Sequence, residues 1–259
     1  MSDLRYRPRV AVAIIIVGRN VGRYGALSVE GVFQASAKVP DVVLSVIAID
    51  DCSSDDTRAQ FNRGREIAVS THFAGDYSVV SNEVWRGFSL SILAGLREID
   101  LKNFKPDLVL ILPGNHQVEV SSIVDLLTAA TANSVTLGYR VNKRTARPPL
   151  KWLSSCVLQL LSGILISRKI RDITGQFLVP PNLLRDAVVG DPRHAWSVRL
   201  SRLIVDSEYP IREIPINLID GFRSRPASEG FRRSPRTRDI LSYLLALIRE
   251  FRFRKVGEW

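Results

Sequence analysis

Short apolar runs alternate along the chain with longer stretches in which apolar residues recur at helical spacing. The runs that predict β-strands lie at residues 10–17, 42–49, 77–80, 108–112 and 135–139. The stretches that predict helices lie at 24–37, 55–67, 88–99 and 121–132, and a helix at 198–207 and a strand at 211–218 follow. Alternation of this kind is typical of βα units, so the sequence predicts an α/β fold with a mostly parallel sheet and flanking helices.

Two further segments bear on membranes. Residues 152–166 are mostly apolar and flanked by basic residues, but they are shorter than the roughly 20 residues that a spanning helix needs. We therefore expect a buried or interfacial helix there. Residues 237–255 combine helical apolar spacing with basic residues at the end, which predicts an amphipathic helix that packs on the domain or on an anionic membrane surface. This pattern divides the chain into a domain at 1–230 and a helical segment at 231–259.

Composition narrows the choice of partners. The chain has 259 residues, of which 46% are hydrophobic, enough for a substantial core. Its formal net charge of +10 favours anionic partners, namely nucleotide phosphates, an acidic membrane surface or nucleic acid. Nucleic acid ranks last, because the arginines fall in predicted loops and no nucleic-acid-binding motif is present. The two cysteines, Cys52 and Cys156, indicate no disulfide framework and predict a reducing, cytoplasmic location.

Two acidic residues follow the apolar run at 42–49. Asp50 and Asp51 therefore lie at the carboxyl end of a predicted buried strand, the edge at which ligands bind in open α/β sheets. Residues 53–55 offer N-cap side chains for the next helix. By itself this pattern is compatible both with a nucleotide-binding turn and with an ordinary strand-to-helix loop.

The same run resembles a motif of the family-2 glycosyltransferases of the GT-A fold. The family's Asp-Asp-Gly-Ser-x-Asp-x-Thr is matched by Asp50-Asp51-Cys52-Ser53-Ser54-Asp55-Asp56-Thr57. Several motifs occur in the family's order over about residues 10–230, closest to the branch that transfers a sugar to a polyprenyl phosphate, such as the dolichol-phosphate mannose synthases. The resemblance implies a mixed, mostly parallel GT-A sheet. It also implies that one acid of the pair accepts a hydrogen bond from a base edge carrying an N–H.

Cys52 departs from this motif, because it stands where the family has Gly. The replacement is tolerated if the residue does not need a positive φ. The rest of the implied nucleotide site lies near two other predicted strands. Asn20 is the residue that remains of the family's Pro-x-Tyr-Asn-Glu, and with Gly18 it is expected to line the base pocket.

Arg86 and Gly87 match the start of the family's Arg-Gly-x-Gly-x-Ala-Leu-x-x-Gly, and Gly95 keeps the spacing to its last Gly. We expect Gly87 to allow a tight entry to the helix. The Arg86 guanidinium is a suitable partner for a diphosphate. Both residues are therefore assigned to nucleotide binding.

The family's metal-binding acids are missing from the next motif. The family has Asp-x-Asp or Pro-Gly-Asp-x-Gln where this chain has Pro113-Gly114-Asn115-His116-Gln117, so Pro113 and Asn115 occupy the acid positions. Magnesium and manganese prefer carboxylate ligands, and the implied site at Asn115 and Gln117 is therefore weak or absent. Three alternatives stay open: weak metal binding, neutralisation of the diphosphate by basic side chains, and loss of activity. The basic candidates are Arg86, Arg140, Lys143 and Arg144.

The acceptor side of the resemblance lies farther along the chain. Arg140 is the last residue of a match to the family's Gly-x-Arg, and Asp172 lies in a stretch that resembles Arg-Asp-x-x-x-Gly-Phe. Asp172 is expected to bind metal, orient a sugar hydroxyl or form a structural pair with a cation. The residues assigned to acceptor or phosphate binding are Gln117, Arg140, Arg144 and Arg223, and those assigned to catalysis are Asn115, His116 and Asp172.

Taken together, these motifs imply a glycosyltransferase that moves a sugar from a nucleotide-sugar donor to a polyprenyl phosphate or another lipid-linked glycan acceptor. An acceptor phosphate oxygen is already nucleophilic, so no strong general base is needed, and stabilisation of the departing diphosphate carries much of the rate. With a lipid-bound acceptor, the protein would be peripheral on the inner face of the membrane. The alternative is a catalytically degenerate protein of the same fold that binds a sugar nucleotide or acts as a partner at the membrane surface.

Overall fold

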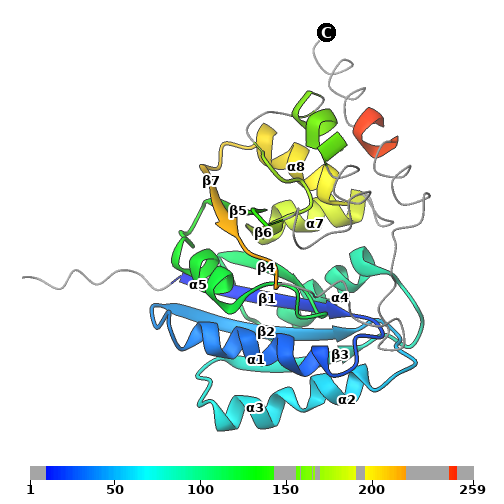
Figure 1. Ribbon diagram of the computed structural model, residues 1–259, viewed down its shortest axis with the longest axis vertical. Helices are drawn as coiled ribbons and strands as arrows, with labels where there is room; N and C mark the ends of the chain where they lie inside the picture. Colours follow the sequence, from blue (N-terminus) through cyan, green and yellow to red (C-terminus); the bar gives the residue numbers. More distant parts are fainter. Residues whose placement is uncertain are drawn as a thin grey trace, which may run out of the picture.

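A computed structural model describes residues 10–142, 156–157, 159–164, 166, 170–190, 196–219 and 245–249, which form a seven-stranded sheet with helices on both faces (Figure 1). The strands are β1 (Val10–Gly18), β2 (Val42–Asp50), β3 (Asp76–Ser81), β4 (Leu108–Pro113), β5 (Val135–Arg140), β6 (Gln176–Val179) and β7 (Ile211–Ile216). The helices are α1 (Tyr24–Ser36), α2 (Thr57–Asn62), α3 (Gly64–Ser70), α4 (Phe88–Leu101), α5 (Val120–Thr128), α7 (Pro181–Gly190) and α8 (Trp196–Asp206). Lys143, Arg144, Arg223 and most of the segment 231–259 lie outside the described residues.

The strand order is β3-β2-β1-β4-β6-β5-β7, and the predicted mixed, mostly parallel sheet is confirmed. All neighbouring strands run parallel except β6, which is antiparallel to both β4 and β5. The sequence prediction contained neither β6 nor α7. β6 has four residues, all buried, and so short a run shows no periodicity. α7 begins at Pro181, a first-turn position where proline is tolerated.

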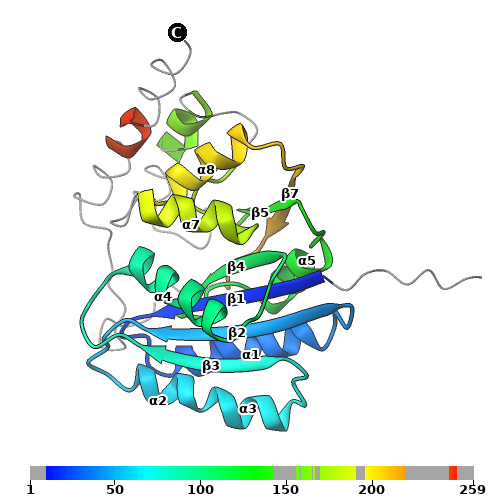
Figure 2. The same cartoon turned by 180° about the vertical axis from the view of Figure 1, so that it is seen from behind.

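The sheet separates two hydrophobic cores, because successive side chains of a strand face opposite sides. Ile15 and Ile47 belong to the core beneath α4, α7 and α8, whereas Ile14 and Val46 belong to the core beneath α1 and α5. α1 lies in front of the sheet in Figure 1, and α4 and α7 lie in front of it in Figure 2. Helices on both faces explain why β1 is an almost continuous apolar run.

The single helix expected at 55–67 is divided into α2 and α3. The Tyr77 hydroxyl of β3 donates a hydrogen bond to the Phe61 carbonyl at 2.6 Å, taking an acceptor at the end of α2. A methyl group at Gly64 would lie 2.5 Å from the same hydroxyl, so glycine lets the chain pass Tyr77. Burial raises the pKa of Tyr77, which keeps this donor protonated. A contact with a distant strand therefore decides where the helix breaks.

No helix in the described part of the chain is long and apolar enough to cross a bilayer. The helical residues at 156–157 and 159–164, within the segment predicted as a buried or interfacial helix, pack Leu161 against the core and expose Leu160 and Ile164. A second helical piece at 245–249 lies beside them in both views (Figures 1 and 2). This piece also has one buried and one exposed side, because it buries Leu247 and exposes Leu245 and Ile248.

The parallel strands β1 to β4 end at one edge of the sheet. Gly18 at the end of β1 pairs with Asp50 at the end of β2, and Asp50 pairs with Ser81 at the end of β3. On the other side of β1, Val17 pairs with Pro113 of β4. The loops that leave these four strands therefore lie next to one another.

We expect Gly95→Val to destabilise the protein by about 1–3 kcal/mol, the usual cost of overpacking a core. A methyl group at Gly95 would lie 2.9 Å from side-chain atoms of Ile15 and Ile49, which fixes how closely α4 approaches the sheet. Urea denaturation measures the change. Arg97→Val, at an exposed site on the same helix, is the control for the effect of a β-branched residue on helix stability. Equal losses of stability in the two variants would contradict the packing argument.

Candidate functional site

The loop after β3 is fastened to the end of β2 by Asp51. The Asp51 Oδ1 accepts hydrogen bonds from the Asn82 side-chain amide and the Arg86 backbone N–H, both at 3.0 Å, and Oδ2 accepts one from the Gly87 N–H at 2.9 Å. Asn82 also donates to Ser91 of α4 at 3.0 Å. Hydrogen bonds to a carboxylate are about twice as strong as neutral ones. The buried Asp51 therefore holds this loop in place.

Asp50 differs from Asp51 in the use of its second oxygen. The Asp50 Oδ1 accepts a hydrogen bond from the Ser53 N–H at 3.2 Å, and no described residue donates to its Oδ2. The residue is only 4% exposed and lies between the ends of β1 and β3. Of the two acids predicted to contact a nucleotide base, Asp50 is thus the one with an oxygen left to accept a hydrogen bond.

Cys52 has φ 56°, so the condition under which it would replace glycine without cost is not met. A left-handed conformation costs a residue with a Cβ roughly 1–2 kcal/mol. The Cys52 thiol donates to the Glu83 carbonyl at 3.5 Å, which adds a second tie between the β2 and β3 loops. Gly87 has φ 85° at the N-cap of α4, in agreement with the tight entry expected there.

The loop between β1 and α1 is tied to the acidic turn. Asn20 donates its N–H to Ser53 Oγ at 3.0 Å and accepts the Ser54 N–H at 2.8 Å. Thr57 Oγ1 accepts two further N–H groups of that loop at 2.7 and 3.0 Å. The N-cap of α2 is Asp56, which makes no side-chain capping hydrogen bond, but the Asp55 Oδ1 accepts the Thr57 N–H at 3.0 Å at the start of this helix. Of the three residues expected to cap the helix, Ser53 and Ser54 join the two loops instead.

The end of β4 packs closely against the end of β1. The Gly114 N–H donates to the Val17 carbonyl at 2.8 Å, and a methyl group at Gly18 would lie 2.8 Å from the Phe61 ring. Gly18 is therefore required for packing of the strand ends. Its contact with a nucleotide stays a prediction.

His116 faces helix α1. Its backbone N–H donates to Ser28 Oγ at 2.8 Å, and a methyl group at Gly31 would lie 3.8 Å from Cε1 of the imidazole. The described residues contain no group of three or more His, Cys, Asp or Glu side chains that could hold a metal ion. Neutral oxygens at Asn115 and Gln117 do not fit a divalent cation that prefers carboxylates, and their roles as ligands stay predictions.

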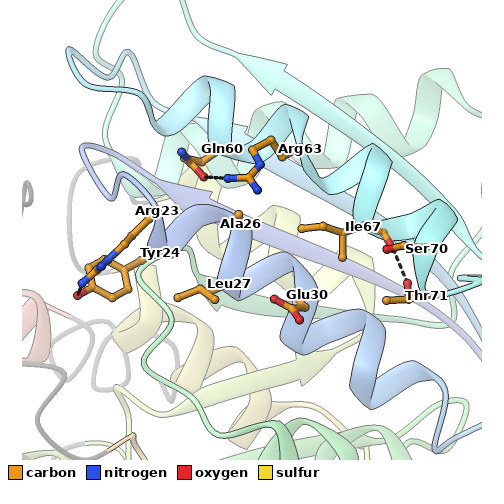
Figure 3. A pocket seen from close by; sticks show the side chains of 10 residues that line it. All are labelled: Arg23, Tyr24, Ala26, Leu27, Glu30, Gln60, Arg63, Ile67, Ser70 and Thr71. Carbon is orange, nitrogen blue, oxygen red and sulfur yellow. Dashed lines mark hydrogen bonds between the residues drawn. The ribbon is translucent and has the colours of Figure 1, made fainter.

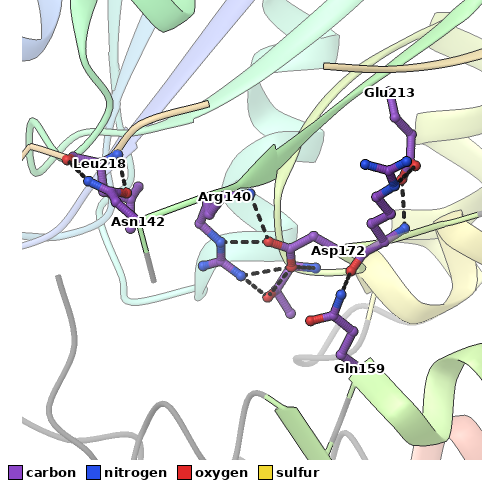
Figure 4. Close-up of polar contacts among 8 residues, drawn as sticks. Arg140, Asn142, Gln159, Asp172, Glu213 and Leu218 are labelled. Atoms are coloured by element: carbon purple, nitrogen blue, oxygen red, sulfur yellow. Dashed lines mark hydrogen bonds and ion pairs between the residues drawn. The ribbon is translucent and has the colours of Figure 1, made fainter. Parts of the chain in front are cut away.

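Arg140 and Asp172 form a buried ion pair (Figure 4). The Arg140 Nε donates to Asp172 Oδ2 at 2.8 Å and one Nη donates to Oδ1 at 2.9 Å, while the Arg140 backbone N–H lies 3.3 Å from Oδ2. Asp172 also accepts the Thr174 N–H and hydroxyl, both at 3.1 Å. Among the three roles expected of Asp172, the structural pair with a cation is the arrangement observed.

A second set of contacts joins the exits of β4, β5 and β7. The Gln117 carbonyl accepts the Ile219 N–H at 3.0 Å. The Asn142 side chain donates to the Leu218 carbonyl at 2.7 Å and accepts its N–H at 2.9 Å (Figure 4). These contacts place Gln117, which is predicted to bind the acceptor, on the same edge as Arg140 and Asp172.

A pocket of about 530 Å³ lies elsewhere, between α1 and the pair α2–α3 (Figure 3). Its lining includes Arg23, Glu30 and Arg63, and it contains none of the residues predicted from the sequence. The candidate site is therefore the carboxyl edge, and not this pocket.

The structure brings the predicted nucleotide-binding residues together at the ends of β1 to β3, namely Gly18, Asn20, Asp50, Asp51, Arg86 and Gly87. It separately joins Arg140 to Asp172. Asn82, which bridges Asp51 and α4, was not among the residues predicted from the sequence. Its position directly after a predicted strand, opposite the acidic turn, is the signal that could have identified it.

No family model and no curated protein sequence matches the chain. Solved structures do match. Glucosyl-3-phosphoglycerate synthase from Mycobacterium tuberculosis, in complex with Mn²⁺, UDP and glucosyl-3-phosphoglycerate, is 16% identical, with 92% of this chain and 80% of that chain covered and a TM-score of 0.52. Mannosyl-3-phosphoglycerate synthase from Rubrobacter xylanophilus is 14% identical, with coverages of 98% and 80% and a TM-score of 0.54.

A mannosyltransferase from Pyrobaculum calidifontis, in complex with GDP-Man and Mn²⁺, is also 14% identical, with 93% of this chain and 69% of that chain covered and a TM-score of 0.54. At these identities the likeness establishes the fold. The chain has the GT-A fold that the sequence motifs predicted.

We expect Arg140→Met to destabilise the protein by about 3–5 kcal/mol, because it leaves the Asp172 carboxylate buried without its cation. The double variant Arg140→Met/Asp172→Asn should lose less stability than the sum of the losses in Arg140→Met and Asp172→Asn. Urea denaturation of all three variants and the unmodified protein measures this coupling. Full stability of Arg140→Met combined with loss of ligand binding would instead assign the guanidinium to the ligand.

Proposed function

We propose that this chain binds a nucleotide sugar at the carboxyl edge of β1 to β3 and transfers the sugar to an acceptor. The observation that carries the proposal is the buried Asp50 carboxylate, whose Oδ2 receives no hydrogen bond from a described residue. A base edge with an N–H matches this oxygen, since a carboxylate only accepts. Structures of the same fold that contain UDP or GDP-Man support the proposal.

The proposed reaction is a displacement at the anomeric carbon of the donor sugar. An acceptor oxygen bonds to that carbon while the bond to the nucleotide diphosphate breaks, and the diphosphate leaves with the electron pair. Arg86 is assigned to the leaving diphosphate. Its side chain is exposed, and its backbone N–H is fixed by Asp51, so the guanidinium extends from a defined position. Cations positioned where charge develops lower the barrier.

A divalent metal, when bound, neutralises part of the diphosphate charge. Mn²⁺ is present in structures of the same fold. In this chain Asn115 and Gln117 are neutral and Pro113 has no ligand atom in its side chain. We therefore assign most of this neutralisation to basic side chains. The candidates are Arg86, Lys143 and Arg144. Arg223 is added from the acceptor side, and Arg140 is set aside because its guanidinium pairs with Asp172.

The proposed acceptor is a polyprenyl phosphate or another lipid-linked glycan precursor, reached at an anionic membrane surface. Exposed aliphatic side chains gather on the helical pieces at 156–157, 159–164 and 245–249, and the chain carries a net charge of +10. This combination favours binding to anionic lipid. The competing acceptor is a soluble phosphate compound, because the solved structures of the same fold include complexes with phosphoglyceric acid.

The alternative is a sugar-nucleotide-binding protein without turnover. It is favoured by Pro113 and Asn115 at the two acid positions, and by the absence of a metal-ligand group among the described residues. Asn115→Asp is the distinguishing variant. Appearance of Mn²⁺-dependent transfer in this variant, from an inactive parent, would establish the alternative.

We expect the protein to bind UDP or GDP sugars in isothermal titration calorimetry with EDTA present, and Asp50→Asn to raise Kd roughly 10- to 100-fold. The change removes a charged acceptor, and such hydrogen bonds are worth about 1.5–3 kcal/mol. Glu83→Gln removes an exposed charge from the neighbouring loop and should leave Kd unchanged. Absence of nucleotide binding in the unmodified protein would refute the proposed function.

We expect the protein to float with liposomes of anionic lipid, and Leu160→Ser/Ile164→Ser to reduce the bound fraction by at least half, since the variant removes exposed apolar area. Val69→Ser/Leu101→Ser removes aliphatic residues of α3 and α4 that are more exposed than Leu160 and Ile164, and it should leave the bound fraction unchanged. Transfer to phosphoglycerate but not to polyprenyl phosphate, without flotation, would assign a soluble acceptor.

A further inference from the structure

Trp85 is a large aromatic residue that the protein holds at the candidate site without covering it. It is 56% exposed, although the loop that carries it is fixed on both sides. Two residues before it in the loop, the Glu83 carbonyl accepts a hydrogen bond from the Cys52 thiol. The next two residues, Arg86 and Gly87, donate their N–H groups to Asp51. The indole therefore extends from a backbone that hydrogen bonds hold on both sides of Trp85.

Arg19 lies over the Trp85 ring, with the guanidinium carbon 4.9 Å from the ring centroid. Arg19 directly follows β1, and Trp85 lies in the loop after β3. β2 lies between these two strands, and its last residue, Asp50, pairs with Gly18 on one side and with Ser81 on the other. The contact therefore spans the strand end that carries the Asp50 carboxylate.

This arrangement fits a planar ligand better than it fits a purely structural contact. A structural tryptophan would be expected to bury more of its surface, and the cation–π contact of an exposed pair is weaker than stacking of a nucleic acid base on an aromatic ring. A base that enters beside Asp50 can therefore replace Arg19 on the indole. The ring would then contact the face of the base while the Asp50 Oδ2 accepts an N–H from its edge.

We propose that Trp85 is the stacking platform for the base of the nucleotide, and that Arg19 covers the same ring face when no nucleotide is bound. This inference rests on the proposed function, because it assigns two further residues to the same donor site. Stacking on an aromatic ring tolerates every base, so Asp50 selects the base edge and Trp85 contributes affinity.

The test is titration with UDP and GDP, followed by calorimetry and by tryptophan fluorescence. Trp85→Ala should raise Kd at least tenfold, whereas Trp85→Phe, which keeps an aromatic face, should stay within about threefold of the unmodified protein. Nucleotide should quench the fluorescence of the unmodified protein, and Trp85→Phe should remove that quenching. Val84→Ala, at an exposed neighbour in the same loop, is the control and should bind normally.

Arg19→Ala tests the covering role, with uridine and guanosine as probes because they lack phosphates. Removal of the competing guanidinium should leave their affinity equal or higher, and a loss of affinity would overturn this role. Equal nucleotide affinity of Trp85→Ala and the unmodified protein would overturn the platform while the proposed function stands. A loss of nucleotide affinity that is equally large in Trp85→Ala and Trp85→Phe also overturns the stacking role of Trp85. If the unmodified protein binds neither nucleotide, the proposed function itself fails.

Discussion

The hydrogen bonds accepted by the buried Asp51 carboxylate join the end of β2 to the loop that precedes α4, and the candidate site is built on this connection. Without that acceptor, two backbone N–H groups and the Asn82 amide would lose a partner, and each buried unsatisfied polar group costs about 1–3 kcal/mol. The same loop carries Arg86 and Trp85. Both side chains are exposed, so their usefulness to a ligand depends on a backbone that is already ordered.

A second buried carboxylate has a comparable role beyond β4. Asp172 accepts hydrogen bonds from the Arg140 side chain and from Thr174, so it ties the end of β5 to the turn before β6. Breaking such a pair leaves an uncompensated charge in the interior, which is why it is costly to disrupt. Asp51 at one end of the site and Asp172 at the other therefore stabilise the fold through their hydrogen bonds. Asp50 remains the acid with an oxygen available to a ligand.

The fold could be predicted where local pattern and tertiary burial agree. β1, β2 and β4 are covered on both faces by helices, so each is an almost continuous apolar run that the sequence reveals directly. The break between α2 and α3 could not be predicted, because it depends on the Tyr77 hydroxyl, which reaches Phe61 from another strand. β6 was missed for a related reason: its four residues become a strand only between β4 and β5.

The sequence by itself determined which chemical groups are present and in what order. It placed two acids at the carboxyl end of a predicted strand, and it showed that Pro113 and Asn115 stand at the acid positions of the metal motif. Only the tertiary structure decided that Asp51 accepts hydrogen bonds from backbone N–H groups, that Asp172 pairs with Arg140, and that Arg19 lies over the Trp85 ring. The physical reason is that these partners are far apart along the chain, so packing of the strands chooses which polar groups satisfy one another and which are left for a ligand.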